Sequence, residues 1–417
     1  MRLLLAAFGD PGHAFPMIAL GRALAARGHE VTVETWRRWE ADVRAGGMAF
    51  SPAPEEPVFP TPAHPMDPYA AAVPLVRRTL PIVEELRPDG VVADVLTLAP
   101  ALAAELAGVR FATLIPHVHP AMEPGFPPYS SGARLPRTAL GRRLWRVPAS
   151  SVERALLVGR DQLNAARGQL GLAPLRRLWG GMSRELCLVG TFPHLEYPRA
   201  WPAGTQVVGP LLWEPPLPAD AEPPPGEGPV VLVAPSTSQD SEQRLLRSAL
   251  DGLADQPVRV LAATAGRRVE PVPANARTVD WLSYARTMPR CDVVVCHGGY
   301  GTVARALACG CVVVAVPAGG DMSENAARID WAGVGVRVPR RLCSPRSVRL
   351  AVGRALAVAR LRRRARELAA WAAENDGAER AADAVEQWAC GGRSIRRGRA
   401  RGSRGPDPAA PGTSLGR

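Results

Sequence analysis

Short apolar runs alternate with longer helix-like segments along most of this chain, and the alternation occurs in two series. The first series spans residues 1–209 and the second spans residues 230–388. Strands that alternate with helices in this way are typical of parallel sheets covered by helices on both faces. The sequence therefore predicts an α/β protein with two doubly wound, Rossmann-like domains.

The expected elements follow from the apolar runs and their stop signals. Strands are expected at 3–8, 31–33, 90–94, 110–115, 230–234, 258–262, 292–296, 312–316 and 334–338. Helices are expected at 14–27, 98–106, 241–252, 302–309, 323–332 and 345–373. Between the two series, residues 210–229 form a proline-rich and therefore stiff linker. Residues 389–417 have almost no large apolar side chains, which predicts a basic, disordered tail.

The basic residues exclude several classes of enzyme. All 51 of them are arginine, and the net charge is +12. Without a lysine the chain has no P-loop lysine and no Schiff-base lysine, which excludes P-loop kinases and pyridoxal enzymes. Seven arginines and one aspartate in the tail supply +6 of the net charge. No aromatic side chains are interleaved with these arginines, so nucleic acid is not an expected partner and the tail is expected to be a solvated extension. The alternative is that the tail binds RNA or acidic lipid weakly.

The cellular compartment is inferred from three features. No apolar run reaches the roughly 18 residues that a membrane-spanning helix needs. The apolar start of the chain ends at Gly9-Asp10-Pro11, too early for a signal peptide. Seven irregularly spaced cysteines fit reduced thiols better than disulfides. These features predict a cytoplasmic protein without a transmembrane segment.

A glycine-rich turn, Cys296 to Thr302, lies between an expected strand and an expected helix. Such a turn exposes free backbone N–H groups and directs the positive end of the helix dipole outward. Its glycines, Gly298, Gly299 and Gly301, allow close approach, while His297 and Thr302 add side-chain donors. The turn predicts a phosphate or diphosphate site, with an ordinary α/β turn as the alternative.

Several segments in a fixed order resemble the family 1 (UDP-glycosyltransferase-like) glycosyltransferases of the GT-B fold, particularly bacterial members that glycosylate antibiotics and other natural products. The matching segments are Gly12-His13, Ala23 to Val31, Pro88 to Asp94, Val207 to Pro210, Trp281, His297 to Thr302, and Pro317 to Asp321 with Asn325-Ala326. They span nearly the whole chain except the tail. The resemblance implies two domains that face each other across a cleft, with residues 1–209 binding the acceptor and residues 230–388 binding a nucleotide-sugar donor.

This chain departs from the usual residues of the family at two places. The family usually ends its sugar-binding loop with Asp-Gln, and this chain has Asp321-Met322. A methionine cannot replace the hydrogen bonds that a glutamine makes to sugar hydroxyls, so the departure points to a deoxysugar donor, with Glu324 or Asn325 as the alternative source of the hydrogen bond. Ser283-Tyr284 also stands where many relatives carry Pro-Gln.

The resemblance places His13 in the first βα loop, facing the cleft. A neutral imidazole is a suitable base near pH 7, and Asp94, at the end of another strand, is positioned to accept a hydrogen bond from its far nitrogen. The carboxylate would fix the tautomer and stabilise the imidazolium, as in a Ser-His-Asp triad. His13 and Asp94 are the predicted catalytic residues; the alternatives are a loop-capping histidine and a helix N-cap.

The expected donor site lies in the second domain. In addition to the glycine-rich turn, it includes Ser236, Thr237 and Ser238, whose alternative role is helix capping. Trp281 matches the tryptophan on which the family stacks the base, with a core position as the alternative. Asp321 and Met322 would contact the sugar. No Asp-x-Asp motif is present, so neither a metal nor a cofactor is expected, and the leaving diphosphate would be stabilised by the helix dipole and hydrogen-bond donors.

The expected acceptor site lies under residues 52–80 and 116–150, where aromatic and sulfur-containing side chains supply apolar area. Its predicted members are Met66, Tyr69, His117, Met122, Phe126, Tyr129 and Trp145. A hydrophobic aglycone is the expected substrate, with a lipid or carotenoid as the alternative.

Together these features predict an inverting, metal-independent hexosyltransferase that uses a UDP- or TDP-sugar. A catalytically silent homologue that activates another transferase and a nucleotide-sugar epimerase are the alternatives. The donor sugar, the acceptor and the choice between monomer and homodimer are left open by the sequence.

Overall fold

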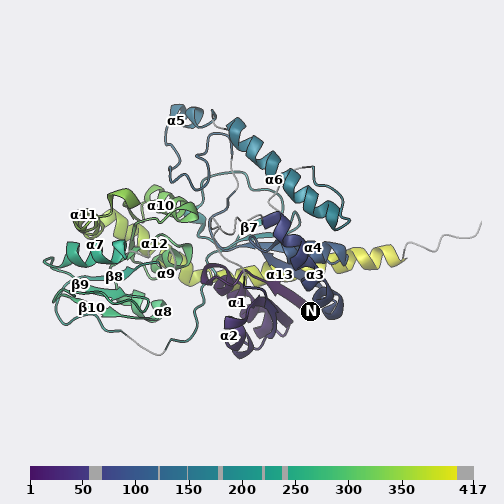
Figure 1. Cartoon of the computed structure of the whole chain (residues 1–417), viewed down its shortest axis with the longest axis horizontal. Helices are drawn as coiled ribbons and strands as arrows, with labels where there is room; N and C mark the ends of the chain where they lie inside the picture. Colours follow the sequence, from purple (N-terminus) through teal and green to yellow (C-terminus); the bar gives the residue numbers. More distant parts are fainter. Residues whose placement is uncertain are drawn as a thin grey trace, which may run out of the picture.

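The computed structural model describes residues 1–55, 68–120, 123–147, 149–176, 182–217, 221–236 and 243–401. In this part of the chain, the strands form two separate parallel sheets with helices packed around each (Figure 1). The alternation of strands and helices therefore predicted the fold class correctly.

The first sheet, within the described residues, has the strand order β3-β2-β1-β4-β5-β6-β7. Its strands are β1 (Arg2–Ala6), β2 (Glu30–Trp36), β3 (Ala49–Ala53), β4 (Gly90–Asp94), β5 (Phe111–Ile115), β6 (Cys187–Val189) and β7 (Thr205–Val207). Its helices are α1 (Pro11–Ala26), α2 (Glu40–Ala45), α3 (Pro68–Leu86), α4 (Leu98–Leu106), α5 (Ala139–Leu144) and α6 (Ala149–Gln169). The sequence pattern did not predict β3, β6 or β7. β6 and β7 have only three residues each, and β3 and β7 are the edge strands of the sheet.

The second sheet has the order β10-β9-β8-β11-β12-β13 in the described residues. Its strands are β8 (Val230–Ala234), β9 (Arg259–Ala263), β10 (Ala276–Val279), β11 (Val293–Cys296), β12 (Val312–Ala315) and β13 (Gly335–Arg337). Its helices are α7 (Arg244–Leu253), α8 (Tyr284–Thr287), α9 (Tyr300–Ala308), α10 (Gly320–Ala332), α11 (Pro345–Ala357) and α12 (Ala359–Glu374). The single helix expected at 345–373 is thus two helices, because α11 packs mainly on α7 whereas α12 packs on α9.

Each sheet reverses its strand order at one point, and these points locate the site. In the first sheet β1 lies beside β4, with Ala6 paired to Ala93. In the second sheet β8 lies beside β11, with Ala234 paired to Cys296. Ligands of doubly wound folds bind beyond the carboxyl ends of the strands at such a reversal. The loops after β1, β4, β8 and β11 are therefore the places to look for functional side chains.

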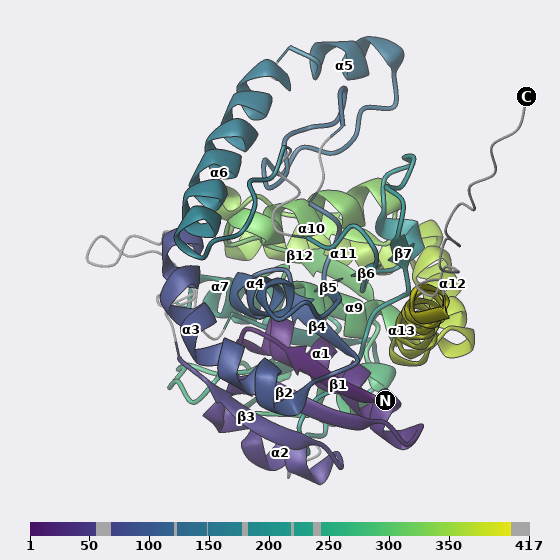
Figure 2. The same ribbon diagram turned by 90° about the vertical axis from the view of Figure 1, so that its right-hand side faces the viewer.

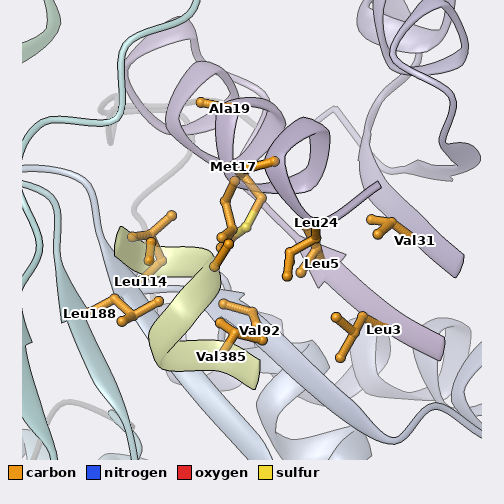
Figure 3. Close-up of a cluster of buried hydrophobic side chains, with 14 of the residues drawn as sticks. Leu3, Leu5, Met17, Ala19, Leu24, Val31, Val92, Leu114, Leu188 and Val385 are labelled. Atoms are coloured by element: carbon orange, nitrogen blue, oxygen red, sulfur yellow. The ribbon is translucent and has the colours of Figure 1, made fainter. Parts of the chain in front are cut away.

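The last helix, α13 (Gly377–Arg401), returns from the second half of the chain to the first domain. It packs against α1, and Val385 lies among Val92, Leu114 and Leu188 in the first core (Figure 3). Trp388 and Ala389 are buried in the same cluster. Residues 389–401, expected to begin a disordered tail, thus belong to a helix whose start is fixed by core contacts; residues 402–417 lie outside the described residues.

The chain crosses between the domains at two neighbouring places. The first is the start of the linker at Gly209-Pro210, and the second is the turn between α12 and α13. The space that a Cβ would need at Gly377 is filled by the carbonyl oxygens of Gly209 and Pro210. Trp371 of α12 packs against Gly209 from the other side. The two crossings therefore touch each other.

Candidate active site

His13 and Asp94 meet beyond the adjacent ends of β1 and β4. The first helix begins at Pro11 rather than at Ala14 as expected, so His13 lies in its first turn, after the N-cap Asp10. Asp94 is the last residue of β4 and is 2% exposed. Nδ1 of His13 donates a hydrogen bond to Oδ2 of Asp94 at 2.8 Å. The predicted hydrogen bond between these two residues is therefore present.

The Asp94 carboxylate is held so that one oxygen remains available for the imidazole. Its Oδ1 accepts a hydrogen bond from the backbone N–H of Leu96 at 2.9 Å. The N-cap of α4 is Thr97, so Asp94 is not the N-cap that the sequence left as an alternative. Because Nδ1 of His13 donates to Asp94, Nε2 keeps its lone pair. Within the described ranges, no group hydrogen-bonds this Nε2 atom.

Two opposing effects set the pKa of His13. Burial of the ring favours the neutral imidazole, but the charge and hydrogen bond of Asp94 favour the imidazolium. Smaller contributions from Asp10 and Asp321 act in the same direction as Asp94, and the pKa of His13 is raised. Asp321 belongs to the second domain, and α1, which carries His13, contacts α9, which follows the glycine-rich turn, so the two domains meet at these helices.

His117 lies beside His13, and Tyr129 lies beside His117. The rings of His13 and His117 meet edge to face with centroids 5.8 Å apart. Nδ1 of His117 donates to the carbonyl oxygen of Val118 at 2.9 Å, and the Tyr129 hydroxyl lies 3.5 Å from the same nitrogen. Burial, with the positive charge of His13, lowers the pKa of His117. His117 therefore stays neutral when His13 is protonated.

The glycine-rich turn belongs to the second domain, where it connects β11 to α9. Gly298 has a φ of +85°, and a Cβ there would lie 3.0 Å from the carbonyl oxygen of Met322. The ring of His297 fills the space beside Gly299. At Gly301, in the first turn of α9, no heavy atom lies within 4 Å of the Cβ position. The turn thus presents the N-terminal backbone of α9 to open space, as a diphosphate site requires.

The predicted sugar-binding loop is tied to this turn. Asp321 lies half-buried in the first turn of α10, and Nδ2 of Asn325 donates to the carbonyl oxygen of Gly298 at 3.0 Å. Met322 is only 8% exposed. Little of the methionine side chain therefore reaches the surface beside Asp321.

Ser236 follows the central strand β8 of the second sheet, and Trp281 follows its edge strand β10. Ser236 follows β8 and is buried, and Nδ1 of His297 lies 3.4 Å from the carbonyl oxygen of Ala234 in the same segment. Thr237 and Ser238 lie outside the described residues. Trp281 is 57% exposed and lines a surface groove of about 740 Å³ together with Asp280. The core position that the sequence left as an alternative for Trp281 is excluded by this exposure.

The predicted acceptor residues do not all gather near His13. Phe126 packs edge-on against Tyr197 at 5.6 Å, beneath the guanidinium of Arg199, rather than at the His13 ring. Trp145 follows α5, which lies away from both sheets (Figure 2). Tyr69 lies half-buried in α3. Met66 and Met122 lie outside the described residues.

A buried ion cluster joins the two domains, and the sequence pattern did not predict it. Arg328 of α10 contacts Oε1 of Glu324 at 2.7 Å and Oε2 of Glu196 at 3.2 Å, and its guanidinium lies 3.5 Å from the Tyr197 ring centroid. All three charged side chains are at most 4% exposed. Glu196 belongs to the first domain, so the cluster holds the helix that carries Asp321 against the domain that carries His13.

No group of three or more His, Cys, Asp or Glu side chains in the described ranges is arranged to hold a metal ion. None of the described helices is long and apolar enough to cross a membrane.

Comparison with known proteins gives a consistent result. Residues 246–386 match the family described as erythromycin biosynthesis protein CIII-like, C-terminal domain. The chain is 30% identical to 4'-demethylrebeccamycin synthase of Lentzea aerocolonigenes, over 92% of this chain and 99% of that protein. This chain is a family 1 glycosyltransferase of the GT-B fold. It shares its family with glycosyltransferases of antibiotic biosynthesis.

Other relatives of this glycosyltransferase work in different pathways. A PGL/p-HBAD biosynthesis glycosyltransferase of Mycobacterium tuberculosis is 32% identical over 69% of this chain and 68% of its own length. The O-mycaminosyltylonolide 6-deoxyallosyltransferase of Streptomyces fradiae is 29% identical over 93% of this chain and 98% of its own. Among solved structures, the glycosyltransferase of kitacinnamycin superposes with a TM-score of 0.74 at 21% identity, covering 93% of this chain and 98% of that one. That match supports the fold.

Proposed function

We propose that this glycosyltransferase moves a sugar from a nucleotide diphosphate to a hydroxyl of a hydrophobic small molecule, with inversion at the anomeric carbon. Residues 1–209 bind the acceptor and residues 230–388 bind the donor. The observation that carries the proposal is the 2.8 Å hydrogen bond between His13 and Asp94, opposite a glycine-rich turn that follows β11. A base and a diphosphate site across one cleft are what direct displacement of the nucleotide requires.

In the proposed reaction Nε2 of His13 takes the proton of the acceptor hydroxyl. The oxygen forms a bond to the anomeric carbon from the face opposite the diphosphate, and the bond between that carbon and the diphosphate oxygen breaks. Both electrons of the broken bond leave with the nucleotide diphosphate. The proton remains on His13, where the Asp94 carboxylate stabilises the imidazolium.

The leaving group gains negative charge as the bond breaks, and the second domain is built to stabilise it. The free N–H groups at the start of α9, together with His297 and Thr302, are directed at this charge. With these donors the reaction does not depend on a divalent metal. Turnover in excess EDTA is therefore expected to equal turnover with added Mg²⁺, and a loss of activity in EDTA would contradict this part of the proposal.

For the donor we propose a TDP- or UDP-linked deoxysugar. Support comes from the relative named as a 6-deoxyallosyltransferase and from Met322, which cannot hydrogen-bond a sugar hydroxyl as a glutamine would. The burial of Met322 weakens the second argument, since little of the side chain reaches the surface. A substitution of Met322 by glutamine should improve the use of UDP-glucose relative to a TDP-deoxysugar if the donor preference depends on this position.

The proposed function is tested with a panel of UDP- and TDP-sugars, each incubated with and without hydrophobic aglycones. We expect release of nucleotide diphosphate only when donor and aglycone are both present, and a product heavier by one sugar in the mass spectrum. Conversion of the sugar nucleotide without an acceptor would instead identify an epimerase. Donor binding without any reaction would identify a silent homologue. The proton coupling constant at the anomeric carbon of the product distinguishes inversion from retention.

A further inference from the structure

Exposed apolar side chains concentrate on one part of the molecule. Of the twelve large hydrophobic residues that are strongly exposed among the described residues, six lie between residues 140 and 158. They are Leu140, Leu144, Val147, Leu156, Leu157 and Val158, with exposed fractions between 43% and 77%. Single exposed apolar residues are ordinary, but such a concentration of them on one segment indicates an interaction surface. Residues 137–160 are called the α5–α6 arm below.

The arm is fixed at its base and open at its tip. At the base, Arg167 of α6 forms two hydrogen bonds with Glu105 of α4, both at 2.7 Å, and Leu163 is buried. Toward the tip, α5 and the first turns of α6 project away from both sheets (Figures 1 and 2). Leu140, Leu144 and Val147 line a shallow groove of about 470 Å³ there. The arm therefore presents its apolar side chains on an anchored support.

The arm is predominantly basic. Its exposed basic residues are Arg137, Arg142, Arg143, Arg146 and Arg154. The sixth arginine, Arg160, is paired with Asp161 just beyond the arm. Glu153 is the one acidic residue between 137 and 160. In the part of the chain that the structure describes, none of the five exposed arginines forms an ion pair.

We propose that the α5–α6 arm docks on the surface of an anionic lipid bilayer. Apolar side chains flanked by arginines match such a surface, because leucines enter the acyl boundary while guanidinium groups meet lipid phosphates. A second copy of the chain is the wrong partner for this face, since it would bring the same excess of positive charge against itself. The inference does not depend on the sugar donor or acceptor.

The size of the effect follows from the number of charges. An arginine close to an anionic membrane contributes about 1 kcal/mol, or roughly a fivefold change in affinity. Removing three arginines is therefore expected to weaken binding by about 100-fold at low ionic strength. The effect should shrink in concentrated salt, because screening shortens the reach of exposed charges.

The test is co-sedimentation of the full chain with vesicles of phosphatidylcholine alone and of equal parts phosphatidylcholine and phosphatidylglycerol. One variant carries Arg142→Gln, Arg143→Gln and Arg146→Gln, and a second carries Leu140→Ser and Leu144→Ser. A matched control changes the same residue types on the second domain. It carries Arg341→Gln, Arg346→Gln and Arg349→Gln with Leu342→Ser and Leu350→Ser, all at exposed positions.

We expect wild type and control to sediment with the phosphatidylglycerol vesicles, and both arm variants to remain largely in the supernatant. The arginine-rich segment 393–417 is present in every variant, so it cannot produce a difference among them. Equal sedimentation of arm variants and control would overturn the proposal. A wild type that does not bind vesicles but forms a dimer, measured by light scattering and abolished in the leucine variant, would also overturn it. Wild-type protein that binds neither kind of vesicle would likewise overturn it, as expected if the partner were an acidic protein.

Discussion

The two domains contribute different kinds of group to the proposed site. On the first domain, the proposed chemistry depends on two titratable side chains, His13 and Asp94, which are joined by a hydrogen bond. On the second domain, the glycine-rich turn offers mainly backbone N–H groups at the start of α9. A side-chain site changes with pH and fails when one functional group is lost. A backbone site keeps its donors at every pH and fails when a Cβ is added. The following predictions separate these two behaviours.

The largest effect is expected for His13→Ala. Loss of the general base should lower kcat by about 10²–10⁴-fold, while the affinity for UDP or TDP, measured by calorimetry, stays nearly unchanged because the diphosphate site lies on the other domain. His29→Ala is a matched control, because His29 is also paired with a carboxylate, that of Glu386. The side chains of His13 and His29 are 14% and 13% exposed, respectively. A His13 variant within threefold of wild-type turnover would falsify the assignment of the base.

Asp94→Asn should have a smaller effect on rate and a distinct effect on pH dependence. The base must be neutral, so activity rises with pH through the pKa of His13, which Asp94 raises. Removing the carboxylate lowers that pKa, and the rising limb of kcat/KM should move to lower pH while the plateau falls. Asp10→Ser keeps a residue that can cap α1 and should shift the limb less, in the same direction. A limb that does not move in Asp94→Asn would mean that another group sets it.

Gly298→Ala tests the backbone side of the comparison. An alanine at a φ of +85° costs roughly 1–3 kcal/mol, and its Cβ would press on the Met322 carbonyl oxygen at 3.0 Å. We expect about a tenfold weaker affinity for the nucleotide and an unchanged pH profile. Gly333→Ala is also at a positive φ, but at the far end of α10. It should lower the melting temperature without weakening the binding of the nucleotide. Equal donor affinity in wild type and Gly298→Ala would remove the turn from the site.

No effect on melting temperature or turnover is expected when residues 391–417 are removed. The buried contacts of α13 described here end at Ala389, and the removed segment has few apolar side chains. A chain that ends at residue 387 is the contrast. It loses the Trp388 indole, which fills the space beside Gly90 and donates to Glu185 at 3.0 Å. That chain should be clearly destabilised, and equal melting temperatures for the two truncations would mean that α13 does not complete the first domain.

The sequence predicted best what lies at the ends of central strands. His13, Asp94 and the glycine-rich turn follow strands with strong apolar runs, and parallel sheets bring such ends together. The helix starts expected at 98 and 345 were correct, whereas those expected at 14, 302 and 323 were placed two or three residues late. In the late cases polar or glycine residues that read as loop, such as Gly12 and Gly301, belong to the first helical turn.

The sequence predicted poorly what depends on pairing between distant segments. Glu196 and Arg328 are 132 residues apart, and nothing in either local pattern indicates that they meet. The same holds for Phe126, which packs beside Tyr197 because its loop reaches the domain interface. The composition of residues 389–401 suggested a tail, yet Ala389 is buried by contacts with the opposite end of the chain.

The return of α13 to the first domain affects how the protein is made and how it can be recombined. Ala381, Val385 and Trp388 complete a core whose other members are translated first, so the ribosome must finish the entire second domain before the first can close. A nonsense mutation anywhere after the linker leaves an uncovered apolar face on α1 for chaperones and proteases to recognise. For the same reason, a chimera that exchanges second domains at residues 210–229 should retain its own final helix, because that helix packs on the first domain.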